Sequence, residues 1–178
     1  PVFQHFTDYD GDNRMIVEVE MSAGREIACD ERAIVNKLLE DVARDFLLPD
    51  SQCSFAASRD SLRITMSDYP DALIQNSQKL KDMLNRINDI PDDQYAEAVT
   101  EASTQHKQGL QYYTWRSAST IFNDMVKEGC EAKDHLDAPK SKDDVQSFIT
   151  SLKQASHMRF LVIGRATSED VKAVVNNL

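Results

Sequence analysis

Two spacings of apolar residues along this 178-residue chain predict its strands and helices. Every second residue is apolar in 13–21 and in 61–67, which is typical of a strand with one buried face. Another short segment, 53–58, precedes 61–67, and Arg59 and Asp60 between them favour a tight turn. The pattern therefore predicts one strand near the start of the chain and a β-hairpin further along it.

An apolar stripe at helical spacing follows the first predicted strand. It spans 31–48, where Asp30 is the expected N-cap and Pro49 is expected to end the helix. A second helix is predicted to begin near Pro70, because a proline in the first turn has no hydrogen bond to lose. Both helices have one apolar face, so we expect them to pack on the sheet.

Pro91 is predicted to open a third helix that runs to about Lys107. Gly109 is expected to break the helical path before a fourth, aromatic-rich helix over 112–126. The segment 127–144 is polar and charged, which indicates a surface connection.

The last part of the chain predicts a helix, a strand and a final helix. Asp143 begins the first of these helices, and Ser168 is expected to cap the last one. Between them, 158–164 is a continuous apolar run, which predicts a central strand covered on both faces. The element order predicts an α+β fold: a mainly antiparallel sheet of about four to six strands with helices packed on it.

The composition is that of a soluble globular domain. Hydrophobic residues make up 41% of the chain and charged residues 28%, which is too apolar for a disordered protein. We expect one domain over 1–178, excised from a longer chain, because it begins at Pro1 without a signal-peptide pattern. No apolar run approaches about 18 residues, so no membrane span is predicted, and the localisation stays open.

The balance of charges excludes one class of partner. Thirty acidic and 20 basic residues give a net charge of −10, and the basic residues form no cluster, so nucleic-acid binding is not expected. The cysteines Cys29, Cys53 and Cys130 have no C-x-x-C spacing, so they are predicted to be buried thiols.

Metal-binding patterns are incomplete. Asp8, Asp10 and Asp12 alternate as in an EF-hand loop, but Asn13 stands where that loop needs glycine and Val19 where it needs a bidentate glutamate. An acidic turn is therefore favoured over a calcium site.

The histidines stand apart in the sequence, without the paired spacing of a zinc helix. They are His5, His106, His135 and His157. No serine-nucleophile motif and no phosphate-binding glycine loop occurs either. The sequence therefore predicts no catalytic residue and no metal ligand in this chain.

Aromatic residues are densest in the fourth predicted helix, at Tyr112, Tyr113 and Trp115, beside Arg116. Core packing is one interpretation of this cluster. The other is a contact patch for a neighbouring domain or an extended peptide, because tyrosine, tryptophan and arginine are enriched at binding hot spots.

Three phrases of the sequence resemble the repeating domain of the pitrilysin/insulysin zinc metallopeptidases, also called inverzincins. They are SFAASRDSLRITMSDYPDAL, KLKDMLNRINDIPDDQYAEAV and RFLVIGRATSEDVKAVV. Pro91 and Tyr95 match the family's proline-to-aromatic spacing at the start of a helix. The resemblance implies the pitrilysin-type fold over nearly the whole chain.

Departures from the family pattern decide which domain the chain resembles. The family's catalytic helix carries H-x-x-E-H, and the matching helix here, AIVNKLLEDVARD, has no histidine. A later domain of the family offers an arginine and a tyrosine to the substrate; Arg44 stands at the first place, but Phe55 at the second lacks the hydroxyl. The chain thus resembles a non-catalytic, middle-type domain that helps to wall a peptide-enclosing chamber.

The resemblance implies no cofactor in this chain and zinc in the catalytic domain of the parent peptidase. It implies as partners the other domains of that peptidase or a homologous subunit, and a peptide substrate.

Two other functions stay open from the residues. One is a free-standing interaction module that uses the aromatic helix from Tyr112 to Phe122, and the other is an enzyme of unrecognised type built around Asp134, His135 and Asp137.

Overall fold

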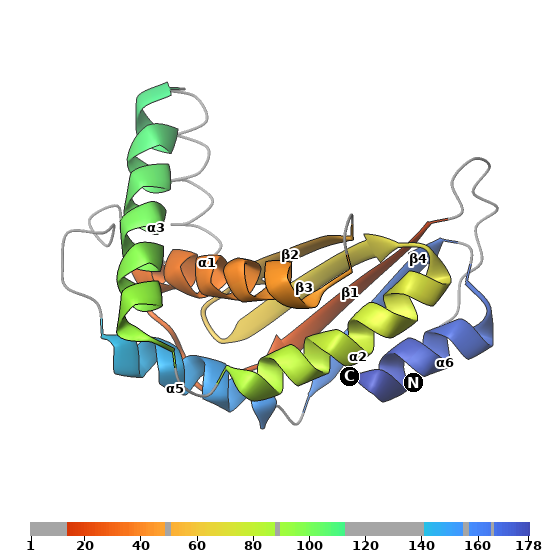
Figure 1. The fold of residues 1–178 in the computed structure, drawn as a ribbon. Helices are drawn as coiled ribbons and strands as arrows, with labels where there is room; N and C mark the ends of the chain where they lie inside the picture. The colour runs from red at the N-terminus through yellow and green to blue at the C-terminus, as the bar shows by residue number, and fades with distance from the viewer. Residues whose placement is uncertain (1–13, 49–50, 88–89, 113–140, 155–156, 165) are drawn as a thin grey trace.

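The computed structural model describes residues 14–48, 51–87, 90–112, 141–154, 157–164 and 166–178. These residues form a four-stranded sheet with a layer of helices on one of its faces (Figure 1). The helical layer covers that face because successive residues of a strand point to opposite sides, and here alternate residues are apolar.

The sheet is antiparallel throughout, with the strand order β2-β3-β1-β4. Its strands are β1 (Met15–Ser22), β2 (Gln52–Ala57), β3 (Ser61–Asp68) and β4 (Met158–Gly164). Both the first predicted strand and the predicted hairpin are confirmed, as is the α+β class.

The position of β4 differs from the prediction. In the described part of the chain, β4 pairs only with β1 and lies at an edge of the sheet. Leu161 is 52% exposed and Ile163 is 46% exposed, so the expectation of a central strand covered on both faces is wrong. A run of apolar residues indicates a strand, but the number of neighbours that the strand has is set by tertiary pairing.

Five helices are described: α1 (Cys29–Phe46), α2 (Pro70–Arg86), α3 (Asp92–Tyr112), α5 (Lys142–Lys153) and α6 (Ser168–Asn177). The helices α2 and α6 pack against each other, and α1 contacts β2, α2 and α3. Figure 1 shows α3 rising away from the layer formed by the other helices. Among the described residues, no helix is both long and apolar enough to cross a bilayer.

Two helix starts lie one or two residues from the predicted ones. Helix α1 follows Ala28, whose N–H donates to the Glu31 carboxylate at 3.4 Å, so Asp30 lies inside the helix. Helix α6 is capped by Thr167, whose hydroxyl accepts from the N–H of Asp170 at 3.2 Å, and not by Ser168. In both helices the side chain of the third helical residue accepts a hydrogen bond from the N–H of the cap residue. A prediction that considers the cap residue alone does not include this contact.

The predicted break at Gly109 is also wrong, because α3 continues through it to Tyr112. A glycine inside a helix costs only about 0.5–1 kcal/mol relative to alanine, which the helical residues on both sides offset. The fourth helix predicted over 112–126 and the connection over 127–144 fall mostly outside the described residues.

The core lies between the sheet and the helical layer. Twelve large side chains are less than 2% exposed: Phe148, Met15, Ile34, Leu39, Leu62, Ile64, Met66, Leu73, Leu80, Met83, Ile149 and Leu152. They come from two strands and three helices, so the core joins segments from both ends of the chain.

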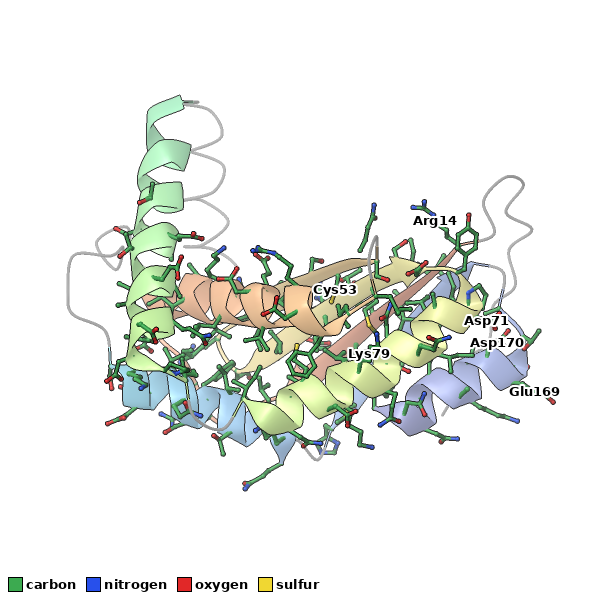
Figure 2. The ribbon with its side chains drawn as sticks, viewed as in Figure 1. Arg14, Cys53, Asp71, Lys79, Glu169 and Asp170 are labelled. Carbon is green, nitrogen blue, oxygen red and sulfur yellow. The ribbon has the colours of Figure 1, made fainter. Side chains whose placement is uncertain are left out.

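The cysteines differ from the expectation of three thiols. Cys29 is disulfide-bonded, whereas Cys53, on β2 beside α1, is a free thiol (Figure 2). Burial raises the pKa of Cys53 to about 12, so this thiol stays protonated at neutral pH.

Candidate functional site: the open face of the sheet

The face of the sheet opposite the helical layer is the candidate functional site. The side chains of Ile16, Glu18 and Glu20 point to it from β1, because the residues between them are buried in the core. Leu161 and Ile163 of β4 point to the same side, since they pair with Glu18 and Ile16. We call this surface the open face.

Two ion pairs lie on the open face and balance its charges. The Arg63 guanidinium lies 3.4 Å from the Glu18 carboxylate, and the Arg159 guanidinium lies 3.9 Å from that of Glu20. Both pairs are partly exposed to water, so each contributes at most about 1 kcal/mol to stability. The open face therefore carries paired charges even though the whole chain has a net charge of −10.

An apolar corner completes the open face at the end where β1 starts and β4 ends. It consists of Ile16, Leu161 and Ile163, which are 39%, 52% and 46% exposed. Tyr69, which is 54% exposed, follows β3 at the same end of the sheet, because Asp68 pairs with Met15. These four are the exposed large hydrophobic residues of the described part of the chain, and such clustering is typical of a contact surface.

A small cavity of about 110 Å³ lies on the helical side, where α2, the end of α5 and the start of β4 meet. Lys153 on its rim donates hydrogen bonds from Nζ to the carbonyl oxygens of Asn85 and Ile87, each at 3.3 Å. Burial lowers the pKa of Lys153. These bonds satisfy carbonyls at the C-terminal end of α2, so the lysine has a structural role in this cavity.

The predicted contact residues are only partly placed. Tyr112 is the last residue of α3, and Tyr113, Trp115 and Arg116 lie outside the described residues. The aromatic patch therefore stays a prediction, as do the acidic turn at Asp8 to Asp12 and the loop around His135.

The described residues do not fit a zinc ion. Helix α1, which the sequence resemblance matches to the zinc-binding helix of the pitrilysin family, has no histidine among its 18 residues. No group of three His, Cys, Asp or Glu side chains in the described ranges is close enough to hold a metal.

Arg44 and Phe55, which the sequence resemblance places at substrate-contact positions of the pitrilysin family, make other contacts in the structure. Arg44 lies on the surface of α1, where its guanidinium pairs with the Asp41 carboxylate at 3.2 Å. Phe55 is 5% exposed and belongs to the core. Neither residue projects onto the open face, so neither takes part in the candidate site.

The apolar corner was missed by the sequence interpretation, although a signal for it was present. The run 158–164 has apolar residues on both sides of the strand, and we expected both sides to be covered. In the structure the side facing the helices is partly covered, and the other side forms the corner.

No family model matches the sequence, and no curated protein matches it either. Among solved structures, a conserved protein from Enterococcus faecalis has a TM-score of 0.63 and 7% identity, over 92% of this chain and 46% of that one. A protease from Helicobacter pylori has a TM-score of 0.59 and 11% identity, over 93% of this chain and 44% of that one. The periplasmic protease PqqL from Escherichia coli has a TM-score of 0.52 and 12% identity, over 88% and 20%.

These likenesses, at 12% identity or less, establish a shared fold alone. Pitrilysin-like proteases are among the structural neighbours, which agrees with the family resemblance at the level of the fold. This chain spans less than half of the length of each of the three proteins.

Proposed function

We propose that this chain is a non-catalytic domain of a pitrilysin-like zinc metallopeptidase, and that its open face lines the chamber in which the peptide is enclosed. The observation that carries the proposal is the combination of a fold shared with proteases and a first helix that has no histidine. A domain that shares the fold without the metal is suited to enclosing and positioning a peptide.

The chemistry of the open face supports this role. Its charges are paired, and its remaining side chains include the small polar residues Ser54, Thr65 and Ser67. A surface of this kind holds no strong pocket for one side chain, so it tolerates peptides of varied sequence. The acid excess of the whole chain favours basic peptides at low ionic strength.

The first experiment tests the absence of catalysis. The purified chain is expected to contain no stoichiometric zinc by metal analysis and to leave a panel of unstructured peptides uncleaved. Stoichiometric zinc, or cleavage that a chelator abolishes, contradicts the proposal.

The second experiment tests the role of the open face with a labelled lysine-rich peptide and fluorescence anisotropy. The double variant Glu18→Gln, Glu20→Gln removes two charges from the open face, and we expect about fivefold weaker binding, since two exposed charges contribute roughly 1 kcal/mol together. The matched control Asp82→Asn, Glu97→Gln removes two exposed charges from α2 and α3. Equal losses in the two variants, or no loss in either, contradict the assignment of the open face.

The proposal also requires an H-x-x-E-H segment in the same polypeptide or in a homologous subunit. The sequence of the full open reading frame and of the proteins that copurify with it tests this requirement. A complete gene product of this length that purifies without such a partner would favour the free-standing interaction module.

A further inference from the structure

The edge of β4 lacks the features that usually protect an exposed strand. The strand MRFLVIG contains no proline, and Arg159 is its only charged residue. Proteins normally shield a sheet edge with charges, prolines or a covering segment, because free N–H and C=O groups attract another strand. In the described part of the chain, nothing pairs with β4 on the side away from β1.

The hydrogen bonds of β1 identify which groups of β4 are directed outwards. The N–H of Ser22 donates to the carbonyl oxygen of His157 at 3.2 Å, so these two residues form a hydrogen-bonded pair of the antiparallel ladder. Such pairs alternate along the ladder, so the odd-numbered residues of β4 bond to β1. The even-numbered residues Met158, Phe160 and Val162 therefore direct their N–H and C=O groups to the free edge, whereas the carbonyl oxygen of Gly164 accepts from the N–H of Ala166 at 3.1 Å.

We propose that this edge pairs with the same edge of a second copy of the chain, in an antiparallel register centred on Leu161. In this register Phe160 lies opposite Val162 of the second copy, and Met158 lies opposite Gly164. The outward-directed residues Met158, Phe160 and Val162 then have hydrogen-bonding partners, and the two sheets join into one.

The side chains are complementary in the same register. Leu161 of one copy lies beside Leu161 of the other, so the two apolar corners meet on the open face and cover each other. Arg159 lies opposite Ile163 of the second copy, and no like charges face each other. A register centred on Arg159 would instead place two guanidinium groups opposite each other, which is unfavourable.

The net charge gives the association a characteristic dependence on salt. Each copy carries a charge of −10, so two copies repel each other at low ionic strength. Salt screens this repulsion and strengthens the burial of apolar side chains. The dimer is therefore expected to tighten as salt is added, whereas an association based on opposite charges would weaken.

The experiment measures the mass of the whole chain in solution by sedimentation equilibrium, over a range of protein and salt concentrations. The wild type is expected to form dimers, and Leu161→Lys and Leu161→Glu are each expected to be monomeric, because residue 161 faces itself across the axis. An equimolar mixture of the two variants is expected to regain the dimer. The control variants Ser54→Lys and Ser54→Glu place the same charges on the far strand of the open face and are expected to leave the dimer unchanged.

Other outcomes overturn the proposal. A wild type that is monomeric at every concentration shows that the edge takes no second copy, and binding of an added peptide to that monomer would identify a different occupant. Dimers that persist in both Leu161 variants place the interface elsewhere. Two monomeric variants that keep the wild-type circular dichroism but fail to combine show that residue 161 does not face itself. The inference rests on the β4 edge and stands whether or not the chain belongs to a peptidase.

Discussion

Gly164, at the end of β4, permits a close approach of two strands that no other residue allows. Its φ of +117° lies in a region that side chains rarely adopt. A Cβ added there would collide with the carbonyl oxygen of Arg14 and lie 3.1 Å from the Cα of Met15. Both atoms belong to the backbone where β1 begins, so relief of the collision would require the strands to move apart.

The substitution Gly164→Ala is therefore expected to destabilise the fold by about 3 kcal/mol. Roughly 1–2 kcal/mol comes from the positive φ, and a similar amount comes from forcing an atom into a filled space. Gly24→Ala is the matched control, because Gly24 also has a positive φ, of +68°, but a Cβ there would meet nothing within 4 Å. We expect a loss of only about 1 kcal/mol for the control.

Urea unfolding followed by circular dichroism gives the free energy of unfolding of the wild type and both variants. The difference between the two variants reports the collision with the backbone of β1 together with the less accessible φ of Gly164, because the control shares only the positive sign of φ. At this chain length, about 2 kcal/mol between them corresponds to a difference of roughly 4–8 °C in the melting temperature. If Gly164→Ala is no less stable than Gly24→Ala, the close approach of β4 to β1 is not a source of stability and the reasoning fails.

Three further predictions concern buried polar groups. The pKa of Cys53 is raised to about 12, which lowers its thiolate fraction at pH 8. Alkylation of Cys53 by iodoacetamide should therefore be on the order of 1000-fold slower in the folded protein than in the protein unfolded by urea. Equal alkylation rates in the two states would contradict the burial of this thiol. Burial raises the pKa of Glu31, so its contribution to stability is greatest in acid and is lost as the pH rises through the folded pKa. Glu31→Gln should therefore be more stable than the wild type at pH 7 in urea unfolding, and the advantage should vanish below about pH 4. Asn76 is 1% exposed, and its side-chain oxygen accepts from the N–H of Leu48 at 3.0 Å. Asn76→Ala should therefore lower the free energy of unfolding by about 1–3 kcal/mol in the same urea assay. An unchanged urea midpoint would show that this hydrogen bond is dispensable.

The sequence by itself determined the local structure of most described elements. The period of two in β1 and β3 and the helical stripes of α1 and α2 directly reflect which side of each element is buried. Such patterns are local, because the side chains of a strand or helix point in directions set by its own backbone. The α+β class followed from the order of these elements.

The same local patterns did not predict where several helices begin and end. Gly109 was expected to end a helix, but the neighbouring residues carry α3 through it. The starts of α1 and α6 depend on a reciprocal pairing with Glu31 and Asp170, and this pairing shifts the boundaries by one or two residues.

Only the tertiary structure decided the candidate site. The apolar run 158–164 is compatible with a central strand and with an edge strand. Apolar side chains favour burial, but they do not specify which strands pair with the segment. Because β4 pairs only with β1 in the described part of the chain, Leu161 and Ile163 are exposed next to Ile16. The apolar corner thus combines residues from opposite ends of the chain. Strand neighbours are chosen by contacts between distant segments, so the open face and its apolar corner exist only once the sheet has formed.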